Sequence, residues 1–90
     1  MNTDKTILTF LRGGQAQTAL RPIMGQYKGR TLYTEGNVLI NYQTRIARLD
    51  GNDLYLNVKK YSVTTSKIQN NIRTEAGYMG LNIIEINGEV

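Results

Sequence analysis

The 90-residue sequence contains no cysteine, no histidine and no tryptophan, and it has a single proline. Without cysteine there are no disulfides and no thiolate metal site, which is usual for proteins of a reducing compartment. Without histidine the commonest general base is missing, and a zinc site is disfavoured. The sequence therefore predicts a protein that is not an enzyme and that holds no metal or other cofactor.

Long apolar runs are absent too. The stretch from Ile7 to Leu11 is too short for the hydrophobic region of a signal peptide, and no run approaches the ~20 apolar residues that span a bilayer. We therefore expect a cytoplasmic protein with no membrane contact. Its length corresponds to a single domain over residues 1–90, with an approach segment at 1–30 and a core at 31–90.

What the sequence does contain is an excess of positive charge. Eleven Lys and Arg stand against seven Asp and Glu, for a net charge of +4. The stretch from Arg12 to Arg48 holds Glu35 as its only acidic residue and is strongly basic. A basic half of this kind favours acidic partners, either nucleic acid or an acidic protein surface.

The clearest local signal is the tetrapeptide Asp-Gly-Asn-Asp at residues 50–53, between two strand-like runs. Gly and Asn tolerate the positive φ angles of a tight hairpin turn. With Gly and Asn as the loop residues, Leu49 pairs with Leu54 and Ala47 pairs with Leu56. These side chains then share the core face of the sheet, because alternate strand residues point to the same side.

The strand before this hairpin is expected to run from Val38 to Leu49, after a first turn at residues 36–37. Its early apolar residues, Val38 and Ile40, have the opposite parity to Ala47 and Leu49. Either a β-bulge shifts the register, or another element partly covers the far face. The second explanation is favoured here, with the helix or the N-terminal segment as the cover.

A helix is predicted over residues 65–76. Thr64 is the expected N-cap, and Val63 against Ile68 would form a hydrophobic staple. Ile68, Ile72 and Ala76 then recur every four residues, with Gly77 as the C-terminal stop.

The two ends of the chain complete the expected fold. Residues 3–12 fit a strand or a short helix, and the glycines at 13 and 14 favour the helix. Residues 15–30 are expected to be extended or irregular. Residues 81–86 form a last strand that is apolar on both parities, as in a strand buried on two faces or used at an interface. The predicted class is α+β: a small antiparallel sheet, made of a three-strand meander and the C-terminal strand, packed with the helix at 65–76 and the short N-terminal helix.

Two stretches of the sequence, INYQTRIA and KKYSVTTSKIQNNI, resemble a short module of phage and mobile-element proteins from Gram-positive bacteria. Its members carry "SY-x-T-x-IA" followed by "KYS-x-TTSKHQ". The matching residues are Tyr42, Thr44, Ile46, Ala47, Lys60, Tyr61, Ser62, Thr64, Thr65, Ser66, Lys67 and Gln69. Ile68 stands where members have histidine, so a role for that imidazole is absent. The resemblance covers about a third of the chain and implies a phage or mobile-element origin, with the protein acting in the cytoplasm of a bacterial host cell.

A candidate partner-binding surface mixes basic and tyrosine side chains. Such side chains contact phosphate and stack on bases in nucleic-acid-binding proteins. The alternative is an ordinary solvated sheet face on which Arg48 lies over Tyr55. The candidate residues are Tyr42, Arg45, Arg48, Tyr55, Lys59, Lys60, Tyr61, Lys67 and Arg73.

Three hypotheses of function follow. The leading one is a phage or mobile-element inhibitor that binds a host protein or ribonucleoprotein complex; by genomic analogy this includes anti-CRISPR inhibition of a Cas effector nuclease. The second is a small nucleic-acid-binding accessory module that uses the basic, tyrosine-bearing sheet face. The third is an assembly role as a homodimer through residues 81–86.

Overall fold

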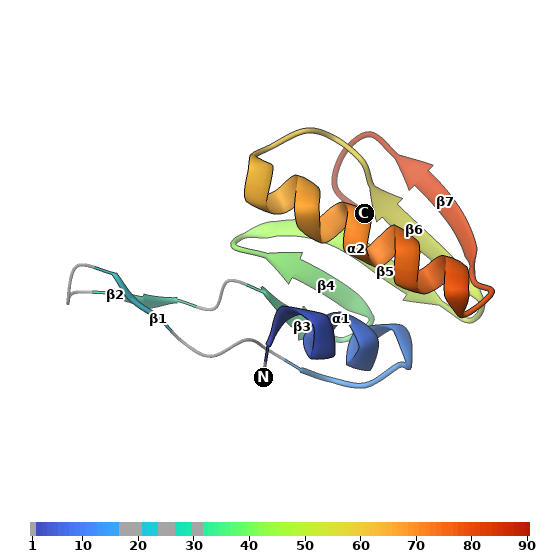
Figure 1. Cartoon of the computed structure of the whole chain (residues 1–90), viewed down its shortest axis with the longest axis horizontal. Coiled ribbons are helices and arrows are strands. Elements are labelled where there is room, and N and C mark those ends of the chain that lie inside the picture. The colour runs from blue at the N-terminus through green and yellow to red at the C-terminus, as the bar shows by residue number, and fades with distance from the viewer. Residues whose placement is uncertain (1, 17–20, 24–26, 30–31) are drawn as a thin grey trace.

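The computed structural model describes residues 2–16, 21–23, 27–29 and 32–90. Two helices pack on a five-stranded sheet, which confirms the predicted α+β class (Figure 1). In chain order the elements are α1 (Thr3–Leu11), β1 (Arg21–Ile23), β2 (Tyr27–Gly29), β3 (Leu32–Glu35), β4 (Val38–Asn41), β5 (Thr44–Asp50), β6 (Asp53–Asn57), α2 (Val63–Tyr78) and β7 (Asn82–Ile86).

The sheet has the strand order β3-β4-β5-β6-β7. The first four strands form an antiparallel meander, whereas β7 pairs parallel to β6. The expectation of an entirely antiparallel sheet is therefore wrong. The reason is α2, which carries the chain back along the sheet and lets β7 start at the same end as β6. Parallel neighbours require such a crossover.

The predicted hairpin at residues 50–53 is confirmed. Leu49 pairs with Leu54 and Ala47 pairs with Leu56 in the register set by the two-residue loop. Gly51 has a φ of 61°, the left-handed conformation that a tight hairpin turn needs. The local turn chemistry was sufficient to fix this register.

The predicted single strand from Val38 to Leu49 is instead two strands. Asn41 pairs with Thr44, and a two-residue turn at Tyr42 and Gln43 reverses the chain between β4 and β5. Tyr42 has a φ of 58°. This conformation is uncommon and costly for a non-glycine residue. The residue types Tyr and Gln therefore do not predict a turn at this position.

The β-bulge that was the alternative explanation for the opposite parities of Val38 and Ala47 is present between β4 and β5. Leu39 pairs with Ala47, but Ile40 pairs with Arg45, so Ile46 is the extra residue of a β-bulge. Ile46 and Ala47 are consecutive and are both fully buried. The bulge restores the parity that the turn shifts, so Val38 pairs with Arg48 on the face opposite to Ala47. Val38 and Ile40 are only 7% and 8% exposed, so the far face is partly covered at β4, as the favoured explanation expected.

The core lies between the two helices and one face of the sheet. Its residues on α2 are Ile68, Ile72 and Ala76, the predicted stripe. The helix is longer than predicted: Ser62 is its N-cap, with Oγ accepting a hydrogen bond from the Thr65 amide, and it continues to Tyr78. The expected cap at Thr64 and the stop at Gly77 are therefore wrong. Val63 is 76% exposed, which excludes the predicted staple.

The short N-terminal helix is confirmed as α1. Asn2 caps it through a hydrogen bond from the Lys5 amide to Oδ1, and Ile7, Phe10 and Leu11 are buried against the sheet and α2. A hydrogen bond of 2.7 Å from Asn71 to Asp4 joins the two helices at the surface. Neither helix in the described ranges combines the length and apolar character that a bilayer crossing requires.

The segment at residues 15–30, expected to be extended or irregular, is extended at its two described strands. Arg21–Ile23 and Tyr27–Gly29 pair antiparallel as a separate two-stranded sheet. Pro22 occupies a strand here, which is compatible with a two-stranded ribbon because each strand is an edge.

Candidate functional site

One end of the five-stranded sheet collects most of the predicted binding residues. β4 ends, β5 begins, β6 ends and α2 begins at this end, so residues far apart in the sequence become neighbours (Figure 1). We call this region the cationic end. Its residues are Tyr42, Arg45, Lys59, Lys60, Tyr61 and Lys67.

The buried side chain of Asn57 links the backbone segments that form the cationic end. Its side chain is fully buried at the last position of β6. Its Nδ2 donates to the Arg45 carbonyl at 3.2 Å and to the Tyr61 hydroxyl at 2.9 Å. Its Oδ1 accepts from the amides of Lys59 at 2.9 Å and Gly88 at 3.2 Å. One side chain thereby connects β5, the loop after β6 and the segment after β7.

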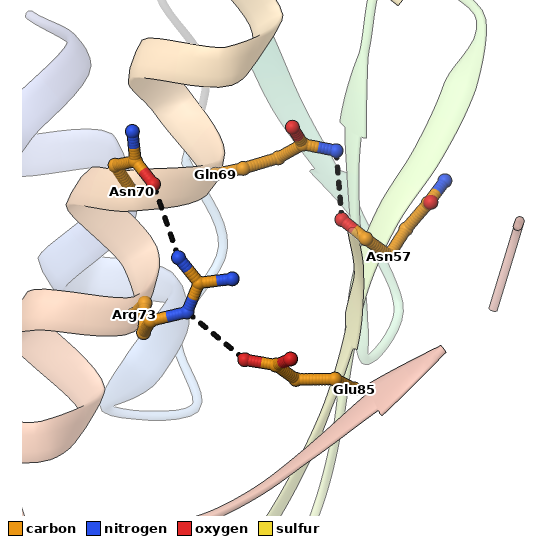
Figure 2. A network of polar contacts seen from close by, with 5 residues as sticks. All are labelled: Asn57, Gln69, Asn70, Arg73 and Glu85. Carbon is orange, nitrogen blue, oxygen red and sulfur yellow. Dashed lines mark hydrogen bonds and ion pairs between the residues drawn. The ribbon is translucent and has the colours of Figure 1, made fainter. Parts of the chain in front are cut away.

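Gln69 fastens the same loop to α2. Its Nε2 donates to the Asn57 carbonyl at 2.7 Å, as Figure 2 shows, and to the Lys59 carbonyl at 2.9 Å. Gln69 is only 6% exposed. These two bonds hold the chain from the end of β6 to Lys59 against α2.

The turn at Tyr42 is held by a separate contact. The Thr65 hydroxyl in the first turn of α2 donates to Oδ1 of Asn41 at 2.7 Å, and both residues are buried. Asn41 directly precedes Tyr42, so this bond places the exposed tyrosine next to the start of α2.

The side chains around this buried framework point to solvent. Arg45, Lys59, Lys60 and Lys67 are all exposed, and Tyr42 and Tyr61 are 52% and 42% exposed. The Lys59 ammonium lies 5.8 Å from the centroid of the Tyr61 ring, near the limit of a cation–π contact.

Negative charge is sparse at this end. Glu89 approaches it and accepts a hydrogen bond from the Arg45 amide at 2.9 Å through Oε1. The acidic side chains of the hairpin turns, Glu35, Asp50 and Asp53, lie at the opposite end of the strands. These three carboxylates and the cationic end are therefore separated along the strand direction.

The prediction that all the candidate residues share one surface is wrong. Arg48 and Tyr55 are paired neighbours in the middle of the sheet, on the face opposite to the helices, and the Arg48 guanidinium lies 4.3 Å from the Tyr55 ring centroid. This is the cation–π pair expected under the alternative interpretation, in which these side chains belong to an ordinary solvated sheet face. Both are half-buried, so they are separate from the exposed side chains of the cationic end.

Arg73 lies on the helix side of the sheet. Its Nε is 3.1 Å from Oε2 of Glu85, and its Nη1 donates to Asn70 at 3.0 Å (Figure 2). Its charge is thus paired within the molecule. Such a partly exposed ion pair contributes little to stability.

A hollow of about 550 Å³ lies away from the cationic end. It is bordered by the C-terminal end of α1 and by the hairpin turns at residues 36–37 and 51–52, with Phe10, Leu49 and Arg12 among its lining residues. None of the predicted binding residues lines it. The hollow and the cationic end are therefore separate features.

Sequence reasoning missed the polar residues that build the site. Asn57 has the same parity as Asp53 and Tyr55, so the strand pattern gives no sign that it is buried. Gln69 continues the buried stripe of α2 at four residues from Thr65. A polar residue at a core position of a helix is the signal that could have found Gln69, since buried polar groups need partners.

Comparisons of this chain with protein-family models, with curated proteins and with solved structures find no match.

Proposed function

We propose that this chain is a non-enzymatic binding protein of phage or mobile-element origin that inhibits a host factor by occupying an acidic surface, and that its cationic end makes the contact. The observation that supports this most is the grouping of four exposed cations and two exposed tyrosines on a hydrogen-bonded framework. The motif resemblance supports the origin. A Cas effector nuclease in complex with its guide RNA is the first target to test.

The charge separation favours an oriented approach. A partner with negative potential attracts the cationic end and repels the turns that carry Glu35, Asp50 and Asp53. Tyrosine suits the centre of such a contact, because its ring provides a large rigid area and its hydroxyl still finds a polar partner. The buried bonds of Asn57 and Gln69 order the backbone beforehand, which lowers the entropy lost on binding.

The test is a binding and cleavage assay with purified effector complexes. Lys59→Ala/Lys60→Ala and Lys5→Ala/Arg12→Ala each lower the net charge from +4 to +2, and all four side chains are exposed. We expect the first variant to bind and inhibit roughly tenfold more weakly, because it removes cations at the contact, and the second to match the wild type. Equal affinities of the two variants, or no co-elution with any effector, would contradict the proposal.

A second candidate function is binding to single-stranded nucleic acid, supported by the exposure of Tyr42 and Tyr61 beside the cations. Their rings could stack on bases while the cations contact phosphates. If all four cations do so, the logarithm of the association constant should fall with the logarithm of salt concentration with a slope of about 3. A fluorescence anisotropy series with labelled oligonucleotides measures this slope. The Lys59→Ala/Lys60→Ala variant should halve it; an unchanged slope would exclude the cationic end as the binding site.

A further inference from the structure

The two edges of the five-stranded sheet differ in how they are protected. At the β3 edge, the Thr34 amide donates to the Ala16 carbonyl at 2.9 Å, and the Ala16 amide donates to the Thr34 hydroxyl at 2.9 Å. The segment before β3 thus covers that edge. Among the described residues, no strand or segment pairs with the outer edge of β7.

The orientation of the β7 backbone identifies the groups on its open edge. The Asn82 amide donates to the Asn52 carbonyl at 2.9 Å, and the Ile86 carbonyl accepts from the Val58 amide at 2.8 Å, so both residues face inward. Backbone direction alternates along a strand. The amides and carbonyls of Ile83 and Glu85 therefore point outward.

β7 also lacks the usual devices that discourage edge pairing. It contains no proline, no lysine and no bulge, and its one charged residue, Glu85, is on the helix side in an ion pair with Arg73. On the other face, Ile84 is half-buried and continues a cross-strand row that runs from Val38 through Arg48 and Tyr55. An apolar edge without protection is a template for another strand.

We propose that β7 pairs antiparallel with β7 of a second copy of this chain, with the twofold axis at Ile84, to form a continuous ten-stranded sheet. In this register Ile83 lies opposite Glu85 of the second copy, and the two exchange both backbone hydrogen bonds. All four outward groups of each strand are then paired. Ile84 lies opposite itself and joins the two cross-strand rows.

Competing registers are less complementary. An axis at Glu85 sets two like charges opposite each other, which is unfavourable in a strand pair. An axis at Asn82 or Ile86 uses only part of the strand, because it sets Glu85 opposite residue 79 or Ile83 opposite residue 89, outside β7. The register centred on Ile84 is the one that uses the whole strand and satisfies its outward groups. This dimer is independent of the function proposed for the cationic end.

Disulfide trapping tests the register directly, because the natural sequence has no cysteine. In a non-hydrogen-bonded antiparallel pair the Cα atoms lie about 4.5 Å apart, within the range of a disulfide. Ile84→Cys should form a covalent dimer under mild oxidation. Asn82→Cys is the matched control on the same face of the same strand: its cysteines would be about 13 Å apart in this register and should stay reduced. Absence of cross-linking in the first variant, or equal cross-linking in both, would overturn the proposal.

Sedimentation equilibrium provides the second readout. Wild type should shift from monomer to dimer between about 1 µM and about 1 mM, the range of a modest interface. Glu85→Pro removes an outward amide without touching the pairing with β6 and should remain monomeric, while Glu85→Ala, which also lacks the carboxylate, should dimerise like the wild type. A wild type that stays monomeric throughout, or a folded Glu85→Pro variant that dimerises normally, would contradict the model.

Discussion

Replacement of Asn57 by alanine is expected to lower the free energy of unfolding by about 3 kcal/mol. The substitution removes four hydrogen bonds at once, two donated by Nδ2 and two accepted by Oδ1. Asn57 is fully buried, so water has little access to this region. The Arg45 carbonyl and the Lys59 amide would therefore lose these hydrogen bonds without a ready replacement. Urea unfolding followed by circular dichroism should show a lower midpoint with an unchanged slope.

The control for this prediction is Asn87→Ala, the same chemical change at an exposed position, which should stay within about 0.5 kcal/mol of the wild type. Tyr61→Phe removes one of the four partners of Asn57 and should fall between the two. If Asn57→Ala costs less than about 1 kcal/mol, the network does not hold the cationic end together.

Ile72→Ala should also cost about 3 kcal/mol, for a different reason. Ile72 is fully buried where α2 packs on the sheet, and truncation leaves a cavity that the neighbouring strands cannot close. Against a total stability of roughly 5–13 kcal/mol for a domain of this size, the loss is large. Scanning calorimetry should record a decrease in Tm of about 15 °C.

Thr74→Ala is the matched control on the same helix. Thr74 is exposed, and alanine has the higher helix propensity, so the variant should be as stable as the wild type or slightly more stable. Equal losses in the two variants would mean that α2 is not anchored through its Ile72 face.

The elements predicted well are those whose cause is local. The hairpin at residues 50–53 contains its own turn chemistry, and the four-residue repeat of Ile68, Ile72 and Ala76 is a property of a helix by itself. The N-cap was misplaced by two residues, because Ser62 and Thr64 both fit the local pattern. In the folded protein the Thr65 amide donates to the Ser62 hydroxyl, while the Thr65 hydroxyl donates to Asn41.

The turn at Tyr42 illustrates what local reasoning could not reach. Tyr42 and Gln43 have no preference for a turn, and the positive φ of Tyr42 is unfavourable when considered alone. Its energetic cost is offset by distant partners, namely the start of α2 at Asn41 and the bulge at Ile46 that buries an extra side chain. A single strand was therefore the reasonable prediction, and the chain makes two.

The sequence by itself determined the α+β class, the hairpin register, both helices and the positive charge, because each depends on residues close together in the chain. Only the tertiary structure decided which charges lie together. It brought Arg45, the lysines of the loop and Lys67 to one end, paired Arg73 with Glu85, and set β7 parallel at an open edge. The physical reason is that buried polar groups such as Asn57 and Gln69 must find partners, and those partners are distant in sequence.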